Sequence, residues 1–195
     1  MIEDCTALIL AGGESRRMGE DKAKLMLNGQ TLLQSVISTM QPLFAEVIVS
    51  VKQPRPEIEI AQVCDDAAHA GPLAGLAAGL ERMQTPWLFA VACDMPFITP
   101  ALIEYLAKQR ADFQAVVPMV QGFPQPLAAL YAASCLPAVR ACLKGTGRHS
   151  LRALLEGLQV RYVNENEMRD ADPELASFFD LDTPQDMVQA RNFKT

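Results

Sequence analysis

Residues suited to phosphate binding are concentrated near the start of the chain, in the stretch LAGGESRRMGEDK at positions 10–22. Gly12 and Gly13 directly follow an apolar run, and glycine lets the backbone approach a ligand closely. Successive backbone amides in such a turn can form a concave anion site, to which Arg17 and Lys22 add positive charge. The spacing matches neither the GxxxxGKS/T phosphate loop nor the GxGxxG dinucleotide turn, so neither class is favoured. Acidic residues nearly cancel the charge of the stretch, so an ordinary surface turn is the alternative.

Carboxylates form a second group of candidates, and Asp94 is the foremost of them. It follows an apolar run in the motif CDMP at positions 93–96, and a carboxylate at the mouth of a parallel strand can hold Mg²⁺ beside phosphates. Mg²⁺ commonly takes one or two protein carboxylates, so we expect a helper from the segment DLDTP, either Asp182 or Asp180. The alternative is that Asp94 caps the following turn and that Asp182 caps the last helix.

The segment DDAAHAGPLAGLAAGL at positions 65–80 is the third candidate. Asp65 or Asp66 could face a nucleotide base, and a carboxylate suits guanine because N1–H and the N2 amine are paired donors. The glycines and alanines of the segment also predict close packing of a helix on a sheet. The segment can therefore serve base recognition, helix packing or both.

These segments need a scaffold, and the alternation of apolar and amphipathic stretches supplies one. Strands are expected where apolar and β-branched residues run together, at positions 6–10, 46–51, 60–64, 87–93, 115–120, 126–131 and 160–164. Helices are expected where apolar residues recur three and four apart or where caps and prolines precede them, at positions 31–40, 72–83, 99–110, 134–143 and 149–158. Residues 176–190 predict a short strand, a turn and a closing helix capped by Thr183.

Strands that alternate with crossover helices predict an α/β fold with a single domain over residues 1–195. We expect a Rossmann-like three-layer sandwich with a mostly parallel central sheet. Ligands bind such sheets outside the carboxyl ends of the strands. The candidate segments at 11–24, 64–75, 93–96 and 180–184 all follow predicted strands, so they are expected at that edge.

Composition excludes several classes of protein. A net charge of −6 argues against nucleic-acid binding, which needs a basic face. No apolar run approaches the ~20 residues of a membrane helix, and the acidic N-terminus does not resemble a signal peptide. The five cysteines are scattered without a CxxC pair, which favours free buried thiols in a reducing cytoplasm over a disulfide framework or a zinc site. His69 and His149 stand alone, so they support neither a metal cluster nor a catalytic dyad.

Together the motifs resemble those of the molybdenum cofactor guanylyltransferase (MobA) family, within the nucleotidyltransferase superfamily. Five motifs occur in the family's order over nearly the whole chain: LAGGESRRMGEDK, GPLAG, CDMP, PQPLAALY and DLDTPQDM. The first and third are typical of the wider superfamily. LAGG in place of LAAG, together with GPLAG, points to the guanylyl branch rather than the cytidylyl branch.

The resemblance implies transfer of GMP from Mg²⁺·GTP to the terminal phosphate of molybdopterin, with release of pyrophosphate and formation of a guanine dinucleotide cofactor. It also implies encounters with proteins that deliver the cofactor or mature molybdoenzymes. Such a transfer needs positioning and charge neutralisation more than a protein nucleophile, which accords with the absence of a histidine or cysteine nucleophile constellation. A molybdenum cofactor cytidylyltransferase, a sugar-phosphate nucleotidyltransferase and a non-catalytic pterin-binding module are the alternatives.

The resemblance also assigns site residues. The nucleotide-binding set is Leu10, Ala11, Gly12, Gly13, Lys22, Ser50, Asp66 and Asp94, of which the first four act through their backbone. Arg17, with Arg16 as its neighbour, would stabilise charge on the triphosphate, and Lys22 would bridge phosphates near the reacting centre. Asp66 would face guanine and Asp94 would hold Mg²⁺. The catalytic set is therefore Arg17, Lys22 and Asp94.

Two positions depart from the family pattern. Family members often carry Asn at the end of the second strand, where this chain has Ser50, a shorter donor. The terminal motif is often NxNTP, and here Asp180 and Asp182 replace the asparagines. The added carboxylates would strengthen metal binding but would repel an anionic pterin phosphate unless Mg²⁺ lies between them. Asp182 is therefore a candidate for a second metal ligand or a pterin contact.

Overall fold

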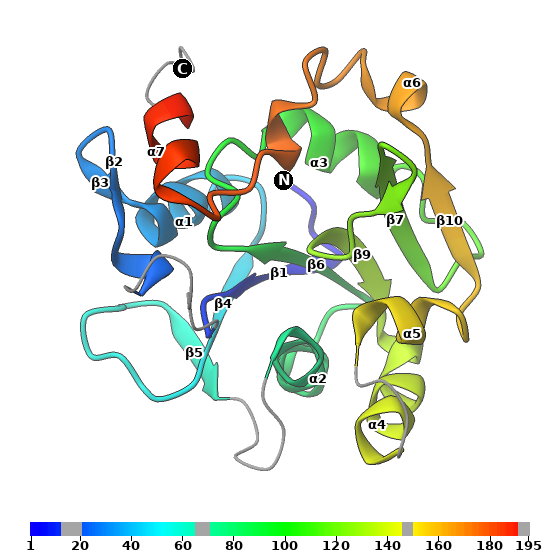
Figure 1. Cartoon of the computed structure of the whole chain (residues 1–195). Helices are drawn as coiled ribbons and strands as arrows, with labels where there is room; N and C mark the ends of the chain where they lie inside the picture. The colour runs from blue at the N-terminus through cyan, green and yellow to red at the C-terminus, as the bar shows by residue number, and fades with distance from the viewer. Residues whose placement is uncertain (13–20, 65–70, 146–149, 191–195) are drawn as a thin grey trace.

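The computed structural model describes residues 1–12, 21–64, 71–145 and 150–190. Figure 1 shows a central sheet between two layers of helices. Within the described residues, the strands cross the sheet in the order β10-β7-β9-β6-β1-β4-β5, and β8 pairs with β7. The strands are β1 (Cys5–Leu10), β4 (Glu46–Val51), β5 (Ala61–Cys64), β6 (Trp87–Ala92), β7 (Ala115–Val120), β8 (Phe123–Pro124), β9 (Ala128–Ala132) and β10 (Val160–Val163).

The sheet is mostly parallel, as the sequence predicts. Among the described strands of this sheet, β9 runs antiparallel to both of its neighbours and β8 runs antiparallel to β7, while the remaining pairs of the sheet are parallel. Helices that connect parallel strands must cross over the sheet, and they cover both of its faces in Figure 1. The expected three-layer α/β fold is therefore confirmed.

The central strand β1 is buried on both faces. Leu8 and Ile9 have no exposed surface, as expected for a parallel strand with helices on each side. Leu10 pairs in register with Ser50 of β4 and with Ala92 of β6. The three strands therefore end side by side, and the loops that follow them start at one edge of the sheet.

Alternate residues of the strands contribute to two separate cores. Leu8 belongs to a cluster with residues of α2, α4 and α5, whereas Ile9 belongs to a cluster with residues of α1 and α3. Successive side chains of a strand point to opposite faces, so one apolar run serves both cores. These helices are α1 (Leu32–Met40), α2 (Pro72–Arg82), α3 (Pro100–Ala107), α4 (Leu136–Lys144) and α5 (Leu151–Leu155).

Glycine allows α2 to approach β1 closely. A Cβ atom on Gly79 would lie 2.6 Å from Cδ2 of Leu8, which is fully buried. The helix begins at Pro72 after Gly71, whose φ of 110° lies in the region that favours glycine. The small residues of this segment therefore do serve the helix packing that the sequence suggests as one of their two roles.

A 3-10 helix and a short hairpin, neither of which the sequence predicts, lead into α1. The helix is η1 (Lys22–Lys24), and the hairpin consists of the strands β2 (Met26–Leu27) and β3 (Gln30–Thr31). Asn28 and Gly29 join the two strands with positive φ values of 49° and 86°, as is typical of Asn-Gly in two-residue hairpin turns. Thr31 and Gln34 then form a reciprocal cap at the start of α1.

The prediction of a short strand near residues 176–180 is wrong. Residues Ala176–Phe178 instead form a 3-10 helix, η3. The cause is Asp172, whose two carboxylate oxygens accept hydrogen bonds from the backbone amides of Ala176 at 3.1 Å and Ser177 at 2.9 Å. Amides that are bonded to a nearby side chain in this way favour a turn over a strand.

The closing helix is confirmed as α7 (Pro184–Ala190), and a short helix α6 (Glu165–Met168) precedes η3. Oγ1 of Thr183 accepts the amide of Asp186 at 3.2 Å, so Thr183 caps α7 as predicted. Within the described residues, no helix is long and apolar enough to span a bilayer.

No disulfide joins the cysteines, all of which lie in the described residues. Cys5, Cys93 and Cys135 are buried, as predicted, whereas Cys64 is exposed and Cys142 is half-buried. Burial raises the pKa of both Cys5 and Cys93 to about 12. These two thiols therefore stay protonated and unreactive at neutral pH.

Candidate functional site

The candidate site begins where β1, β4 and β6 end. The amide of Ala11 donates a hydrogen bond to the carbonyl of Ser50 at 2.9 Å, and the amide of Cys93 donates to the carbonyl of Leu10 at 3.1 Å. The backbone after β1 and the loop that carries Asp94 therefore leave the sheet side by side. Ser50, which the resemblance makes a nucleotide contact, is buried, and its carbonyl fastens the first residue of the neighbouring loop.

Lys22 is held at this edge by its own short helix. Asp21 caps η1, with Oδ1 accepting the amide of Ala23 at 3.1 Å, and the buried Ala23 anchors the turn. The Lys22 side chain is 16% exposed, and its Nζ lies 2.6 Å from Oδ2 of Asp94. Lys22 also forms an ion pair with Oδ1 of Asp182. Residues from three distant parts of the sequence therefore meet around one ammonium group.

Asp182 reaches this cluster because the segment before α7 is fastened to the loop that carries Asp94. The amide of Leu181 donates to the carbonyl of Asp94 at 3.0 Å. The Leu181 side chain is fully buried in a small cluster with Leu27 and Leu32, and Figure 1 shows α7 beside the β2–β3 hairpin and α1. Apolar burial of Leu181 thus places the neighbouring carboxylate at the site.

The side chain of Asp186 accepts the backbone amides that directly precede α7. Oδ2 of Asp186 accepts the amides of Asp182 at 3.0 Å and Thr183 at 2.7 Å. Slight burial opposes the charged form, but the hydrogen bonds from Thr183 and Asp182 outweigh it and lower the pKa of Asp186. Because Thr183 caps α7, the alternative role of Asp182 as the helix cap is wrong, and the carboxylate of Asp182 faces Lys22.

The charges of the cluster are not balanced. Burial would lower the pKa of Lys22, but the hydrogen bonds and charges of Asp182 and Asp94 outweigh it, and the pKa rises above its ordinary 10.5. Partial desolvation of its carboxyl group and then the charges of Asp94 and Asp182 raise the pKa of Asp180 to about 7, although the residue as a whole is exposed. Around Lys22 the described residues thus place more carboxyl groups than cations, which favours a further cation.

Asp94 and Asp182 fit a divalent metal ion. Their carboxylates converge on one cation, and carboxylate oxygens are ligands that Mg²⁺ prefers. Among the described residues, no group of three or more His, Cys, Asp or Glu side chains could hold a metal ion. Mg²⁺ commonly completes its shell with substrate phosphates and water, so this donor set suits a metal ion that arrives with a nucleotide.

Part of the predicted site lies outside the described residues. This part consists of Gly13, Arg16, Arg17, Asp65 and Asp66. Their roles therefore stay predictions. Gly12 is described, and it is half-buried directly after Ala11 at the carboxyl edge.

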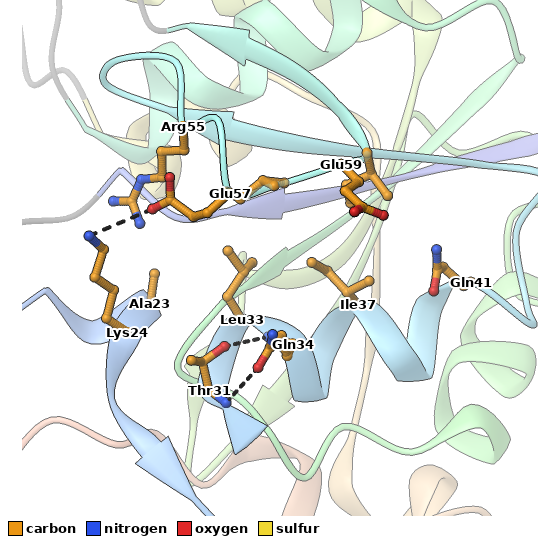
Figure 2. A pocket seen from close by; sticks show the side chains of 12 residues that line it. Ala23, Lys24, Thr31, Leu33, Gln34, Ile37, Gln41, Arg55, Glu57 and Glu59 are labelled. Atoms are coloured by element: carbon orange, nitrogen blue, oxygen red, sulfur yellow. Dashed lines mark hydrogen bonds and ion pairs between the residues drawn. The ribbon is translucent and has the colours of Figure 1, made fainter. Parts of the chain in front are cut away.

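Arg55, which the sequence analysis did not single out, lies next to the cluster. Its Nη2 is 2.7 Å from Oδ2 of Asp21 and 3.5 Å from the carbonyl oxygen of Ala11. Figure 2 shows Arg55 opposite Lys24 at one end of a groove of about 870 Å³, which lies between η1, α1 and the connection from β4 to β5. No local pattern marks this arginine, because its partners are distant in the sequence.

Mostly parallel sheets that are covered on both faces bind ligands at the carboxyl ends of their strands, and the lysine–carboxylate cluster lies at that edge. The model of one family, described as the MobA-like NTP transferase domain, matches residues 7–164. The chain belongs to this family. The match ends before the segment that carries Asp182.

Individual relatives resemble almost the whole chain. A probable molybdenum cofactor guanylyltransferase from Pelotomaculum thermopropionicum is 37% identical over 191 residues, covering 95% of this chain and 91% of the relative. The molybdenum cofactor guanylyltransferase of Desulfosudis oleivorans is 32% identical over 193 residues, covering 97% and 95%. The crystal structure of molybdopterin-guanine dinucleotide biosynthesis protein A from Archaeoglobus fulgidus matches with a TM-score of 0.85 at 28% identity, covering 95% of this chain and 96% of that one.

Proposed function

We propose that this protein transfers GMP from GTP to the terminal phosphate of molybdopterin, releasing pyrophosphate and forming the molybdopterin guanine dinucleotide. The observation that carries this proposal is the position of Lys22 between Asp94 and Asp182 at the carboxyl edge of the sheet. The relatives named molybdenum cofactor guanylyltransferase support the choice of acceptor and base.

The reaction forms one bond and breaks another at the α-phosphorus of GTP. An oxygen of the molybdopterin phosphate attacks that phosphorus, the bridging bond to the β-phosphate breaks, and pyrophosphate leaves with the electron pair. The attacking phosphate is already ionised at neutral pH, so no protein group has to remove a proton from it. Catalysis then depends on positioning and on stabilising negative charge.

Lys22 supplies charge stabilisation in this mechanism. Its ammonium group has three N–H donors, so it can contact a phosphate oxygen while it stays close to a carboxylate. Its raised pKa keeps it protonated throughout the neutral range. By family resemblance, Arg17 would add a second cation from the loop after β1.

Asp94 and Asp182 would hold Mg²⁺ together with the phosphates of the nucleotide. When bound, this ion offsets the charge of the triphosphate, which the carboxylates would otherwise repel. The backbone after β1 would contact the nucleotide, and Asp66 would select guanine through its carboxylate.

The test is pyrophosphate release with molybdopterin, Mg²⁺ and each of GTP, CTP, ATP and UTP. We expect release with GTP. Release with CTP alone would replace the guanylyl transfer by a cytidylyl transfer, and release only when a sugar phosphate replaces molybdopterin would indicate a sugar-phosphate enzyme. Absence of release with every nucleotide would favour a pterin-binding module without catalysis.

A further inference from the structure

Arg55 links two parts of the candidate site that are separate in the sequence. Its guanidinium contacts Asp21, which immediately precedes Lys22, and the carbonyl of Ala11, which follows β1. The Arg55 side chain is 20% exposed, so solvent screens its ion pair less than that of a fully exposed arginine. One side chain therefore ties the backbone beside β1 to the helix that carries the lysine.

Asp21 uses its two carboxylate oxygens for different purposes. Oδ1 accepts the amide of Ala23 and so caps η1, while Oδ2 lies 2.7 Å from Nη2 of Arg55. The orientation of this carboxylate is therefore set from both sides. Because the same carboxylate starts η1, its orientation also sets where the Lys22 side chain begins.

Arg55 is itself held rigidly by its own segment. The side chain of Gln62 on β5 accepts the amide of Arg55 at 2.8 Å and donates to the carbonyls of Arg55 at 2.8 Å and Ile58 at 3.0 Å. The amide of Ile58 donates to the carbonyl of Arg55 at 3.1 Å, which closes a turn with Pro56 at its second position. The arginine thus extends from a fixed base on the sheet.

We propose that Arg55 is a positioning residue: it fixes η1 relative to the backbone of Ala11 and thereby holds Lys22 where it can face the phosphates. Its effect on catalysis rests on the proposed nucleotidyl transfer. Arginine suits this role because its guanidinium is always charged and offers donors in a rigid planar fork. Misplacement of a reacting group by about 1 Å can lower a rate by about 10²-fold.

The first experiment compares Arg55→Ala in two backgrounds. In the wild-type background we expect kcat for pyrophosphate release to fall by about 10–100-fold. In a Lys22→Ala background the same substitution should lower kcat by no more than about threefold, because residues that act as a unit are not additive. Equal losses in the two backgrounds would mean that Arg55 does not act through Lys22 and would overturn the proposal.

Asp21→Asn tests the ion pair separately from the cap. Asparagine is as good a helix cap as aspartate, so η1 keeps its start while the charge that Arg55 contacts is lost. We expect a loss of kcat similar to that of Arg55→Ala, and no further loss in the double variant. Arg55→Lys, which keeps the charge but not the fork, should have an intermediate kcat. Arg140→Ala is the matched control, because Arg140 pairs with Glu81 at 2.8 Å on the surface between α2 and α4.

Hydrogen exchange gives a readout that does not depend on activity. Arg55→Ala should speed amide exchange in the peptide that contains η1 and leave the strands of the sheet unchanged, whereas Arg140→Ala should leave η1 unchanged. If the wild type released no pyrophosphate, the proposed function would fail while exchange in η1 would still decide the role of Arg55. Unchanged exchange in η1 of Arg55→Ala would overturn the positioning role.

Discussion

The two edges of the sheet use charged residues in different ways. At the amino edge, Arg110 pairs with Asp4 at 2.9 Å and lies over the ring of Trp87, with 5.6 Å from Cζ to the ring centroid. At the carboxyl edge, Lys22 faces two carboxylates. The first arrangement balances one positive charge against one negative charge and an aromatic face, whereas the second leaves negative charge in excess.

This difference distinguishes a stabilising contact from a contact with a proposed function. Each contact of Arg110 favours the folded state by itself. Carboxyl groups that lie close together repel one another, and the rise in the pKa of Asp180 to about 7 reflects partial desolvation of its carboxyl group and then repulsion by Asp94 and Asp182. Ionisable groups whose pKa values are shifted by burial and by neighbouring charges are common at functional sites. We therefore expect the amino edge to serve the fold, and the carboxyl edge to serve the proposed metal ion and the phosphates of the nucleotide.

Among the substitutions at the two edges, we expect the largest effect at Asp94. Asp94→Ala should lower turnover by at least about 10²–10³-fold, because the variant lacks the proposed metal ligand and one partner of Lys22. The melting temperature should stay near that of the wild type, since the substitution also relieves repulsion at this edge. Pyrophosphate release and thermal unfolding test the two halves of this expectation. A variant that kept more than about half of its activity would contradict the role of Asp94.

Two lysines on the same turn provide the next test. Lys22→Ala should lower kcat by about 10²-fold and raise the KM for GTP. Lys24 is 66% exposed and lies 3.6 Å from Glu57, so Lys24→Ala should change kcat by no more than about twofold. Steady-state kinetics with GTP as the varied substrate measure both effects. Equal losses of kcat in the two variants would show that catalysis depends on the turn as a whole and not on the ion-paired ammonium group of Lys22.

Asp182→Asn should have a smaller effect than the changes at Lys22 and Asp94. The Asp182 side chain is 49% exposed, so solvent screens its charge, and we expect a rate loss of about tenfold. The loss should diminish as the Mg²⁺ concentration is raised, because the substitution removes a proposed metal ligand. A rate above that of the wild type would mean that Asp182 repels the phosphates and does not support the metal.

At the amino edge, Arg110→Ala should reduce stability and leave the chemistry intact. Loss of the contact with Trp87 and of the hydrogen bond to the carbonyl of Ala107 should lower the free energy of unfolding by about 1–2 kcal/mol. Urea unfolding measures this loss. The value of kcat per folded molecule should match the wild type, and a fall there would remove the distinction between the edges.

Gly79 lies between the two edges of the sheet, and Gly79→Ala should give the smallest effect. Alanine favours the helix by about 1 kcal/mol over glycine, but forcing a methyl group against Leu8 costs about 1–3 kcal/mol. We therefore expect a net loss of about 1 kcal/mol in the free energy of unfolding and unchanged kcat. Gly157→Ala is the matched control, since its Cβ would meet the carbonyl oxygen of Leu154 at an ordinary 3.6 Å.

Much of the fold could be predicted because its causes are local. The β-branched run Glu46–Val51 forms a strand with the predicted bounds, and the cap Thr99 before Pro100 starts α3 where expected. The error at residues 176–180 has a cause that lies outside the segment, because the carboxylate of Asp172 holds those amides in a turn. Local patterns thus predict elements whose hydrogen bonds are made within them or with a regular neighbouring strand.

The candidate site was predictable only in part, for the same reason. Asp94 could be found because it follows a buried strand at the expected edge. The role of Asp182 could not be decided from sequence, because its motif fits a helix cap, and the structure gives that role to Thr183, which accepts the amide of Asp186. Arg55 gave no signal, since its contacts with Asp21 and Ala11 exist only after the strands have paired.

The attachment of Leu181 to the carbonyl of Asp94 has a consequence for synthesis of the chain on the ribosome. Among the described residues the last strand of the sheet ends at Val163, so every described strand is translated before Asp182. A nascent chain can therefore contain all the described strands, together with Lys22 and Asp94, while its charge cluster still lacks one carboxylate. The second proposed carboxylate for the metal–nucleotide would then join the site only after all the described strands have been made.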